Sequence, residues 1–239
     1  RHLLTSINTN GSFLRGKEKQ LIESGLDYLY TSLDAPCLEV NDKIRADAKG
    51  EGSYDDAIAG IAELVRLRDT IGVGLPIIQT KTVLVKENHQ QLLAMARFAQ
   101  DILRVDAWVL GLCVYTTPEL DSRTTEDYIN EFGQEQVHWG GFINKLQDLD
   151  YAEIQRQCEI IAATKWKMSV RIERPFGMPG FDWKTYHENP ELPAALSPMK
   201  CMNPYVFAQM QPNGDLAFCG SQPDYTFGNI RDSRFLECW

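Results

Sequence analysis

The stretch that decides the fold is LPIIQTKTVLVKENHQQLLAMARFAQDILRVDAWVLGLCVY, residues 75–115. It begins with an apolar run at 75–85 and ends with a second at 107–115, and both have the length and composition of buried strands. The segment between them has apolar residues at helical spacing: Leu92, Met95, Ala96, Ala99 and Ile102. A helix is therefore expected from an N-cap at Asn88 to about Leu103. This order, with near-continuous apolar strands, predicts a parallel βα unit.

The same alternation extends toward the N-terminus. Strands are expected at 3–8 and 26–33, with a short helix at 16–24 between them. An amphipathic helix is expected at 54–70, and the polar stretch 39–52 before it is expected to be a loop with one helical turn. The first half of the chain is thus predicted to be an α/β fold made of parallel βα units.

Ligands of parallel βα folds bind at the carboxyl ends of the strands. The residues that follow the expected strands are polar or include glycine: Thr9-Asn10-Gly11, Ser32-Leu33-Asp34, Lys86-Glu87-Asn88 and Tyr115-Thr116-Thr117. Such residues are also what turns and helix caps require. The pattern by itself is therefore compatible with a binding site and with plain turns.

Beyond the last of these strands the sequence becomes polar and acidic. Short helices are expected at 125–132 and 142–149, a longer helix at 151–164 and a further strand at 167–173. Residues 175–198 hold five of the eleven prolines, which indicates a linker. The predicted organisation is a domain at residues 1–175, a Pro-rich linker at 176–200 and a small domain at 201–239.

The C-terminal piece is predicted to contain a β-hairpin. Strands are expected at 205–210 and 216–219, joined by the turn sequence Gln-Pro-Asn-Gly-Asp at 211–215. The hairpin would bring Cys201 and Cys219 to one end. Two thiols there could ligate an iron–sulfur cluster or zinc, but both normally need four ligands, and a disulfide would suit an oxidising compartment.

Composition excludes several classes of protein. The 239 residues are 44% hydrophobic and 24% charged, which is ordinary for a globular domain and unlike a disordered chain. The formal net charge of −9 argues against general binding to nucleic acids or anionic membranes. No apolar run is long enough to span a bilayer, and no secretory leader is visible at the start. The six cysteines include no Cys-x-x-Cys pair.

The C-terminal cysteines carry a more specific pattern. Cys201 is followed by twelve residues, Gly214, four residues and Cys219; the segments Phe-Gly-Asn-Ile (227–230) and Phe-Leu-Glu-Cys-Trp (235–239) come next. This resembles the opening of a SPASM or twitch domain, the auxiliary-cluster domain at the carboxyl end of radical S-adenosylmethionine (SAM) enzymes. Upstream, the segments at 9–11, 32–34 and 83–88 resemble that superfamily's motifs after successive barrel strands.

The resemblance implies a partial (β/α)6 TIM-like barrel, of which about strands 3 to 6 are present, followed by a SPASM/twitch-like cysteine domain. Family members use a [4Fe-4S] cluster to cleave SAM into a 5′-deoxyadenosyl radical that abstracts hydrogen from a peptide, a protein or a small metabolite. An electron donor such as flavodoxin or ferredoxin and a cytoplasmic location are implied as well.

The resemblance also assigns residues. Ser32 would contact SAM, Thr9 and Asn10 would line the cavity between cofactor and substrate, and Asp34 would support that loop; these four are the predicted cofactor-binding residues. The two predicted metal ligands are Cys201 and Cys219, which would ligate an auxiliary [4Fe-4S] cluster.

The sequence departs from the family pattern in two ways. It contains neither the Cys-x3-Cys-x2-Cys motif of the SAM-binding cluster nor the later SPASM cysteines, and Cys238 stands where the family often has an apolar residue. We therefore expect an internal piece of a longer enzyme that cannot cleave SAM alone. Two alternatives stay open: a non-catalytic βα scaffold or binding protein with free cysteines, and a conventional βα-barrel enzyme that uses strand-end Lys, Asp or Glu.

Overall fold

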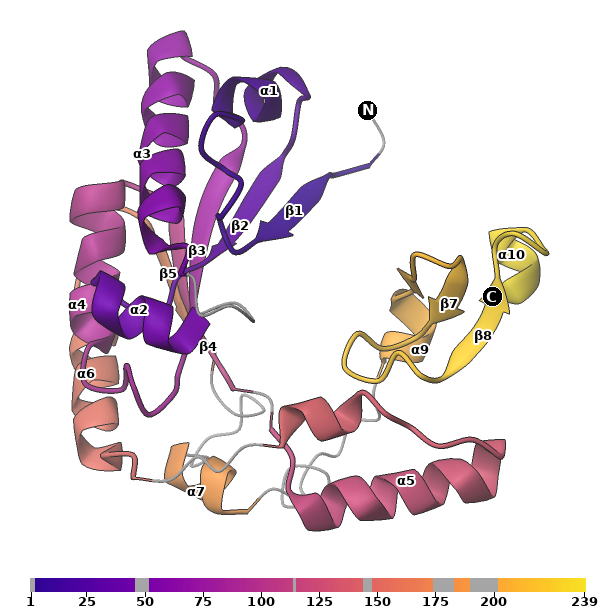
Figure 1. The fold of residues 1–239 in the computed structure, drawn as a ribbon. Helices are drawn as coiled ribbons and strands as arrows, with labels where there is room; N and C mark the ends of the chain where they lie inside the picture. Colours follow the sequence, from indigo (N-terminus) through magenta and orange to yellow (C-terminus); the bar gives the residue numbers. More distant parts are fainter. Residues whose placement is uncertain (1–2, 46–51, 114, 144–147, 174–182, 190–201) are drawn as a thin grey trace. The chain divides into compact units, whose positions relative to one another are not determined.

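The computed structural model of the protein describes residues 3–45, 52–113, 115–143, 148–173, 183–189 and 202–239 (Figure 1). The chain divides into two compact units, Arg1–Cys113 with Leu146–Lys184, and Val114–Lys145 with Thr185–Trp239. The predicted linker at 176–200 lies largely outside the described residues, so the predicted domain boundaries stay predictions.

The first unit contains a five-stranded sheet in which every neighbouring pair is parallel. Its strands follow the chain in order: β1 (Ser6–Thr9), β2 (Tyr28–Ser32), β3 (Ile77–Val83), β4 (Ala107–Gly111) and β5 (Ser169–Ile172). Four of them lie inside segments that the sequence predicts as strands, and β1 extends one residue beyond its predicted segment, to Thr9. The predicted α/β class with parallel βα units is thus confirmed. A partial barrel is a finer statement, which we take up as a proposal below.

Helices pack on one side of this sheet (Figure 1). They are α1 (Glu18–Glu23), α3 (Tyr54–Ile71), α4 (Leu92–Phe98), a π-helical turn (Ala99–Leu103) and α6 (Tyr151–Ala163). Leu29, Ile78 and Trp108 of the sheet are 0–1% exposed and belong to one apolar cluster with residues of these helices. α3 ends because Gly72 adopts φ 76°, a left-handed conformation that glycine tolerates at a helix C-terminus.

Two expectations for the first unit are wrong. The polar stretch at 39–52 begins with a true helix, α2 (Leu38–Arg45), because Asn41 packs its side chain inward and donates and accepts hydrogen bonds there. Asn88 is no helix cap, since α4 begins only at Leu92. The Asn88 side chain instead ties together the loop after β3: its Oδ1 accepts from the Val85 amide at 2.9 Å, and its Nδ2 donates to the Val83 carbonyl at 2.8 Å.

The second unit starts with α5 (Pro118–Phe132), which is longer than the predicted helix at 125–132. Thr117 caps it, because its Oγ1 accepts a hydrogen bond from the Leu120 amide at 3.3 Å, and Pro118 occupies the first turn. A 3-10 turn follows at Trp139–Phe142 and ends where the predicted helix at 142–149 would begin. Residues 144–147 lie outside the described part of the chain.

The C-terminal part of this unit is a three-stranded antiparallel sheet: β6 (Gln209–Met210), β7 (Asp215–Ala217) and β8 (Thr226–Asn229). The predicted hairpin is confirmed, with Met210 opposite Leu216 and Gly214 at φ 94° in the turn. Its first strand is far shorter than predicted, because residues 203–206 form a helical turn, α9 (Asn203–Val206). Two further helices are α7 (Trp183–Glu188) and α10 (Phe235–Cys238).

None of the described helices is both long enough and apolar enough to cross a bilayer.

Candidate functional site

The parallel sheet has two chemically different faces. Residues in register on neighbouring strands point to the same side, and successive residues point to opposite sides. Leu29, Ile78 and Trp108 therefore define the helix-covered face. We call the other side the polar face; its strand and strand-end residues include Asn8, Tyr28, Tyr30, Ser32, Gln79, Lys81, Val109, Arg171 and Glu173. The carboxyl end of this face is the candidate site.

The first two predicted site residues already use their side chains in a turn. Thr9 is the last residue of β1, and its Oγ1 accepts from the Gly11 amide at 3.0 Å. The Asn10 Oδ1 accepts from the amide and the hydroxyl of Ser12, at 3.1 and 2.8 Å. Gly11 has φ 87°, and a Cβ there would lie 2.5 Å from the Ala57 Cβ of α3. The structure thus uses Thr9 and Asn10 to shape the loop that packs on α3.

Ser32 is placed differently. It is the last residue of β2, in register with Lys81 of β3, and it is half-buried on the polar face. Among the residues that the structure describes, its hydroxyl has no hydrogen-bond partner. Thr9 lies nearby, because β1 and β2 pair Thr9 with Thr31. The structure therefore brings the predicted Thr9, Asn10 and Ser32 to one edge of the sheet, where the Ser32 hydroxyl is not used by the described residues.

Asp34 clamps the loop after β2 and does not project onto the polar face. It is 1% exposed; its Oδ1 accepts from the Val83 amide at 2.7 Å, and its Oδ2 lies 2.6 Å from the Arg45 Nε. The Asp34 amide donates to Asn41 Oδ1 and its carbonyl accepts from Asn88 Nδ2, both at 3.0 Å. Burial raises the pKa of the Asp34 carboxyl, while Arg45 and the Val83 amide act in the opposite direction. Asp34 thus fixes the ends of β2 and β3 relative to α2.

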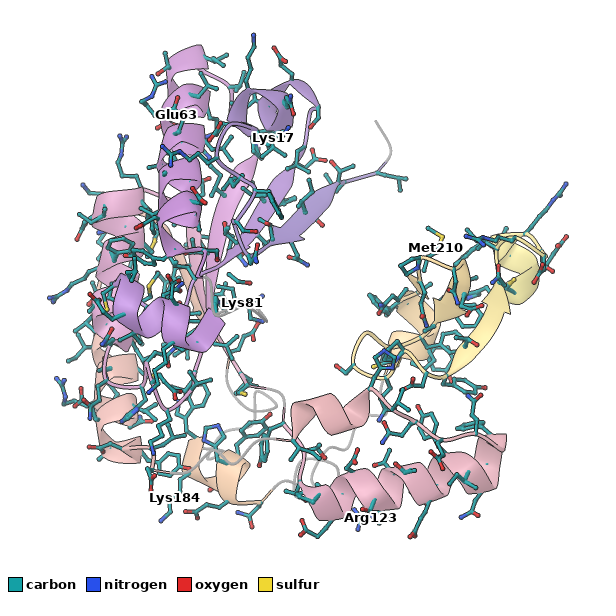
Figure 2. The ribbon with its side chains drawn as sticks, viewed as in Figure 1. Lys17, Glu63, Lys81, Arg123, Lys184 and Met210 are labelled. Atoms are coloured by element: carbon teal, nitrogen blue, oxygen red, sulfur yellow. The ribbon has the colours of Figure 1, made fainter. Side chains whose placement is uncertain are left out.

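The main feature that the sequence analysis missed is a charge cluster on the polar face. Lys81 Nζ lies 3.1 Å from Glu173 Oε2, and Arg171 Nη2 lies 3.0 Å from Glu173 Oε1. Figure 2 labels Lys81 on the side of the sheet away from α4 and α6. The available signal was the alternation of residues 77–83, where polar Gln79 and Lys81 interrupt an otherwise buried strand. A lysine inside such a strand must point to a face that the helices do not cover.

The predicted metal ligands are only partly visible. Cys219 is half-buried and is the second residue after β7, whereas Cys201 lies outside the described residues. Cys238 packs against β8, because a Cβ on Gly228 would stand 2.7 Å from its Sγ. The described part of the chain contains no group of three or more His, Cys, Asp or Glu side chains that could hold a metal ion. The Cys238 side chain is thus packed against Gly228, and its exclusion from the ligand set stays a prediction.

Aromatic and ionic contacts hold the second unit together around Cys219. Phe218 stacks on Phe227 with ring centroids 3.9 Å apart, and Trp239, the residue after α10, meets both rings edge-on. Asp224 Oδ1 lies 2.6 Å from His138 Nδ1. Burial would raise the pKa of Asp224, but hydrogen bonds from the His138 backbone and side chain hold it below the usual value. These contacts hold Phe218, the residue before Cys219, and Asp224, five residues after it.

The fold and the site define an α/β protein that has a parallel sheet, with the described helices of its unit on one face, and a small antiparallel sheet in the second unit. No family model matches the chain. It is 30% identical, over an alignment of 259 residues, to a protein of Pyrococcus furiosus named tungsten-containing aldehyde ferredoxin oxidoreductase cofactor-modifying protein. That alignment takes in 100% of this chain and 60% of the relative, so the chain spans about three fifths of the relative's length.

Proposed function

We propose that this chain is part of a radical SAM enzyme whose substrate is a small metabolite or cofactor. The five parallel strands would be consecutive strands of a partial (β/α)6 barrel, and the second unit would belong to a SPASM/twitch-type domain. The resemblance of the strand-end segments and of the Cys201–Cys219 spacing supports this assignment. So does the relative, because its name describes a protein that modifies a cofactor.

The observation that carries the proposal is the polar face of the sheet. Parallel sheets are almost always covered on both sides, and strands buried on both sides are apolar throughout. Here Tyr30, Gln79 and Lys81 face away from the helices, so this face is built for something other than a second helix layer. In a barrel such a face lines the interior, where substrates and cofactors bind at the carboxyl ends of the strands.

Ser32 is the residue that we assign to SAM contact. Its hydroxyl is half-buried, stands at the carboxyl end of β2 and is unused by the described residues. Thr9 and Asn10 would shape the neighbouring loop and present its backbone to the ligand, and Asp34 would hold that loop in place through Val83 and Arg45. When bound, SAM and its reduced cluster would supply the radical, while the barrel residues orient the substrate and exclude water.

The chain's own cysteines do not fit the cluster that cleaves SAM, because the Cys-x3-Cys-x2-Cys motif is absent from the sequence. The rest of the enzyme would have to supply that motif. Cys201 and Cys219 remain our proposed ligands of an auxiliary [4Fe-4S] cluster, and they are two of the four that such a cluster normally needs. We derive no catalytic step through either cluster from these residues.

The remaining expectations belong to the same proposal. An electron donor such as flavodoxin or ferredoxin would reduce the enzyme, and the location would be the cytoplasm, where thiolates stay reduced. A peptide or protein substrate is the less favoured alternative, because the relative's name points to a cofactor. The competing function is a binding scaffold without cofactor chemistry. It is favoured by the turn contacts that already occupy Thr9 and Asn10.

The deciding experiment begins with the coding sequence upstream of Arg1. A Cys-x3-Cys-x2-Cys motif about two βα units upstream would identify the cluster-binding part. The full-length protein would then be reconstituted anaerobically with iron and sulfide and assayed for 5′-deoxyadenosine. We expect Ser32→Ala to raise the KM for SAM about tenfold, because it removes one hydrogen bond to the cofactor. Absence of the motif, or no 5′-deoxyadenosine from reconstituted protein, would reject the radical SAM assignment.

The auxiliary cluster has a separate test. In the full-length protein, Cys201→Ala with Cys219→Ala should lower iron content by up to about four atoms per chain. Cys238→Ala is the matched control, since that thiol packs against Gly228, and it should leave iron content unchanged. Equal iron in wild type and double variant would reject the ligand assignment without touching the first test.

A further inference from the structure

Charge on the polar face runs against the charge of the whole chain. The protein has a formal net charge of −9. Yet the charged residues that the described strands and their pairing positions place on the polar face are Lys81, Arg171 and Glu173. One carboxylate is therefore shared by two cations, which leaves a local surplus of one positive charge.

The cluster stands in the same row as the residue assigned to SAM. Register aligns Ser32, Lys81, Val109 and Arg171 across four adjacent strands. Adjacent strands are about 4.8 Å apart, so the Ser32 and Lys81 backbones are immediate neighbours and the two cations flank Val109. A ligand group held by Lys81 and Arg171 would lie near Val109, two strand spacings or about 10 Å from the Ser32 backbone.

Space for the lysine is built into the sheet. A Cβ on Gly111 would lie 2.2 Å from Lys81 Cε and 3.2 Å from Glu173 Oε2. The absence of a side chain at 111 is thus what lets the Lys81 stem lie across β4 toward Glu173. Glu173 is also fixed from behind, because the Leu112 amide donates to its Oε2 at 3.3 Å. Lys81 and Glu173 are 41% and 27% exposed in their side chains, so the ammonium is positioned and still accessible.

We propose that Lys81 and Arg171 form a subsite for an oxyanion group, a phosphate or carboxylate, of the substrate. This inference rests on the proposed function and narrows its substrate class to small molecules that carry such a group. Glu173 keeps the two cations in place in the absence of ligand. An arriving oxyanion gains charge-assisted hydrogen bonds from both cations, and Arg offers the planar fork that suits these groups.

The test uses the full-length protein and two simple probes, inorganic phosphate and pyrophosphate, titrated with backbone amide NMR. We expect the amides around residues 81, 111 and 171–173 to shift on titration. Lys81→Gln should weaken binding about fivefold or more, and Glu173→Gln should tighten it about twofold, because these changes alter the local charge in opposite directions. Lys19→Gln on exposed α1 makes the same change in net charge elsewhere and should leave binding unchanged.

Gly111→Ala separates position from charge. The added methyl group must displace the Lys81 side chain while every charge is kept, so we expect weaker binding with an unchanged net charge. Arg171→Gln, at a side chain that is 66% exposed, provides a second variant that leaves the fold intact if Lys81→Gln fails to fold. Phosphate shifts confined to other parts of the chain, or equal affinity in Lys81→Gln and Lys19→Gln, would overturn the subsite.

A final arm distinguishes substrate from cofactor. In the full-length protein, with its SAM-binding cluster reconstituted, phosphate is titrated again in the presence of saturating SAM. Retained phosphate binding supports a substrate subsite beside the cofactor, whereas its complete loss would assign Lys81 and Arg171 to the SAM carboxylate and reject the proposal. The phosphate and pyrophosphate titrations without SAM need no cluster and no turnover, so a failed radical assay would leave their outcome readable on its own.

Discussion

The two faces of the five-stranded sheet are built from the same strands and obey different rules. On the helix-covered face, Ile78 and Trp108 are 0% exposed and packed among the side chains of the helices. On the polar face, Gln79 and Lys81 alternate along β3 with the buried Ile78 and Thr80 and remain half-buried. Burial of about 25 cal/mol per Å² of apolar surface makes the first face the main source of stability. The second face contributes little stability and is where a ligand can be recognised.

The sharpest test of this contrast uses two consecutive residues of β3. Ile78→Ala should lower the free energy of unfolding by about 2–5 kcal/mol, because it opens a cavity in a fully packed core. Gln79→Ala is the matched control on the polar face and should change it by less than about 0.5 kcal/mol. Urea unfolding followed by circular dichroism measures both. Similar losses for the two variants would mean that both faces are packed in the same way.

The next largest loss of stability is expected at Asp34, which holds the loop after β2 against β3 and α2. Asp34→Ala should cost about 3 kcal/mol, because it leaves the Val83 amide and Arg45 without their buried carboxylate. Asp34→Asn retains an oxygen that can accept from Val83 and should cost clearly less. Thermal unfolding of the two variants gives the comparison. Equal unfolding midpoints for Asp34→Ala and wild type would show that the contacts of Asp34 do not stabilise the loop.

A smaller loss of stability is expected when the hydrogen bond between Thr82 and Trp108 on the helix-covered face is removed. Thr82 Oγ1 donates to the Leu33 carbonyl at 2.7 Å and accepts from Trp108 Nε1 at 2.9 Å. Thr82→Val keeps the shape but leaves a buried indole N–H without an acceptor, so we expect a loss of about 1–3 kcal/mol. Thr82→Ser, which retains the hydroxyl, is the control. Chemical denaturation measures the free energy of unfolding. The same value for Thr82→Val and for the wild type would show that the hydrogen bonds of Thr82 do not stabilise the protein.

The smallest effect on stability is expected where the largest effect on binding lies. Lys81→Gln should change the free energy of unfolding by less than about 0.5 kcal/mol, because its ion pair with Glu173 is partly exposed. Denaturant unfolding beside Lys19→Gln measures this difference directly. A loss of several kcal/mol would show that Lys81 is a structural residue of the sheet and would break the division of roles between the faces.

Much of the fold could be read from local pattern. Near-continuous apolar runs at 75–85 and 107–115 with a helix between them already imply parallel strands, and the turn sequence at 211–215 implies the hairpin. The errors fell on short elements with weak signals. The helix α2 and the helical turn α9 depend on contacts that are distant in sequence or on very few residues. Asn88 has cap chemistry, yet its side chain serves the loop before the helix.

The candidate site was predicted in part. The sequence alone determined that Thr9, Asn10, Ser32 and Asp34 lie at or just after the ends of strands, because strand ends are marked by polar and turn-forming residues. Their different uses were decided by the tertiary structure: Asp34 is buried against Arg45, whereas the Ser32 hydroxyl stays open. Cys201 and Cys219 as cluster ligands remain a prediction from spacing.

What only the tertiary structure decided is which charges meet. Lys81 and Glu173 are 92 residues apart and Gly111 lies between them in the chain, so no local pattern links the three. Parallel pairing of β3, β4 and β5 fixes their register and brings them onto one face. The sequence sets the alternation of each strand, since successive side chains point to opposite sides. Strand order and register, which arise from packing of the whole unit, determine the neighbours of each side chain.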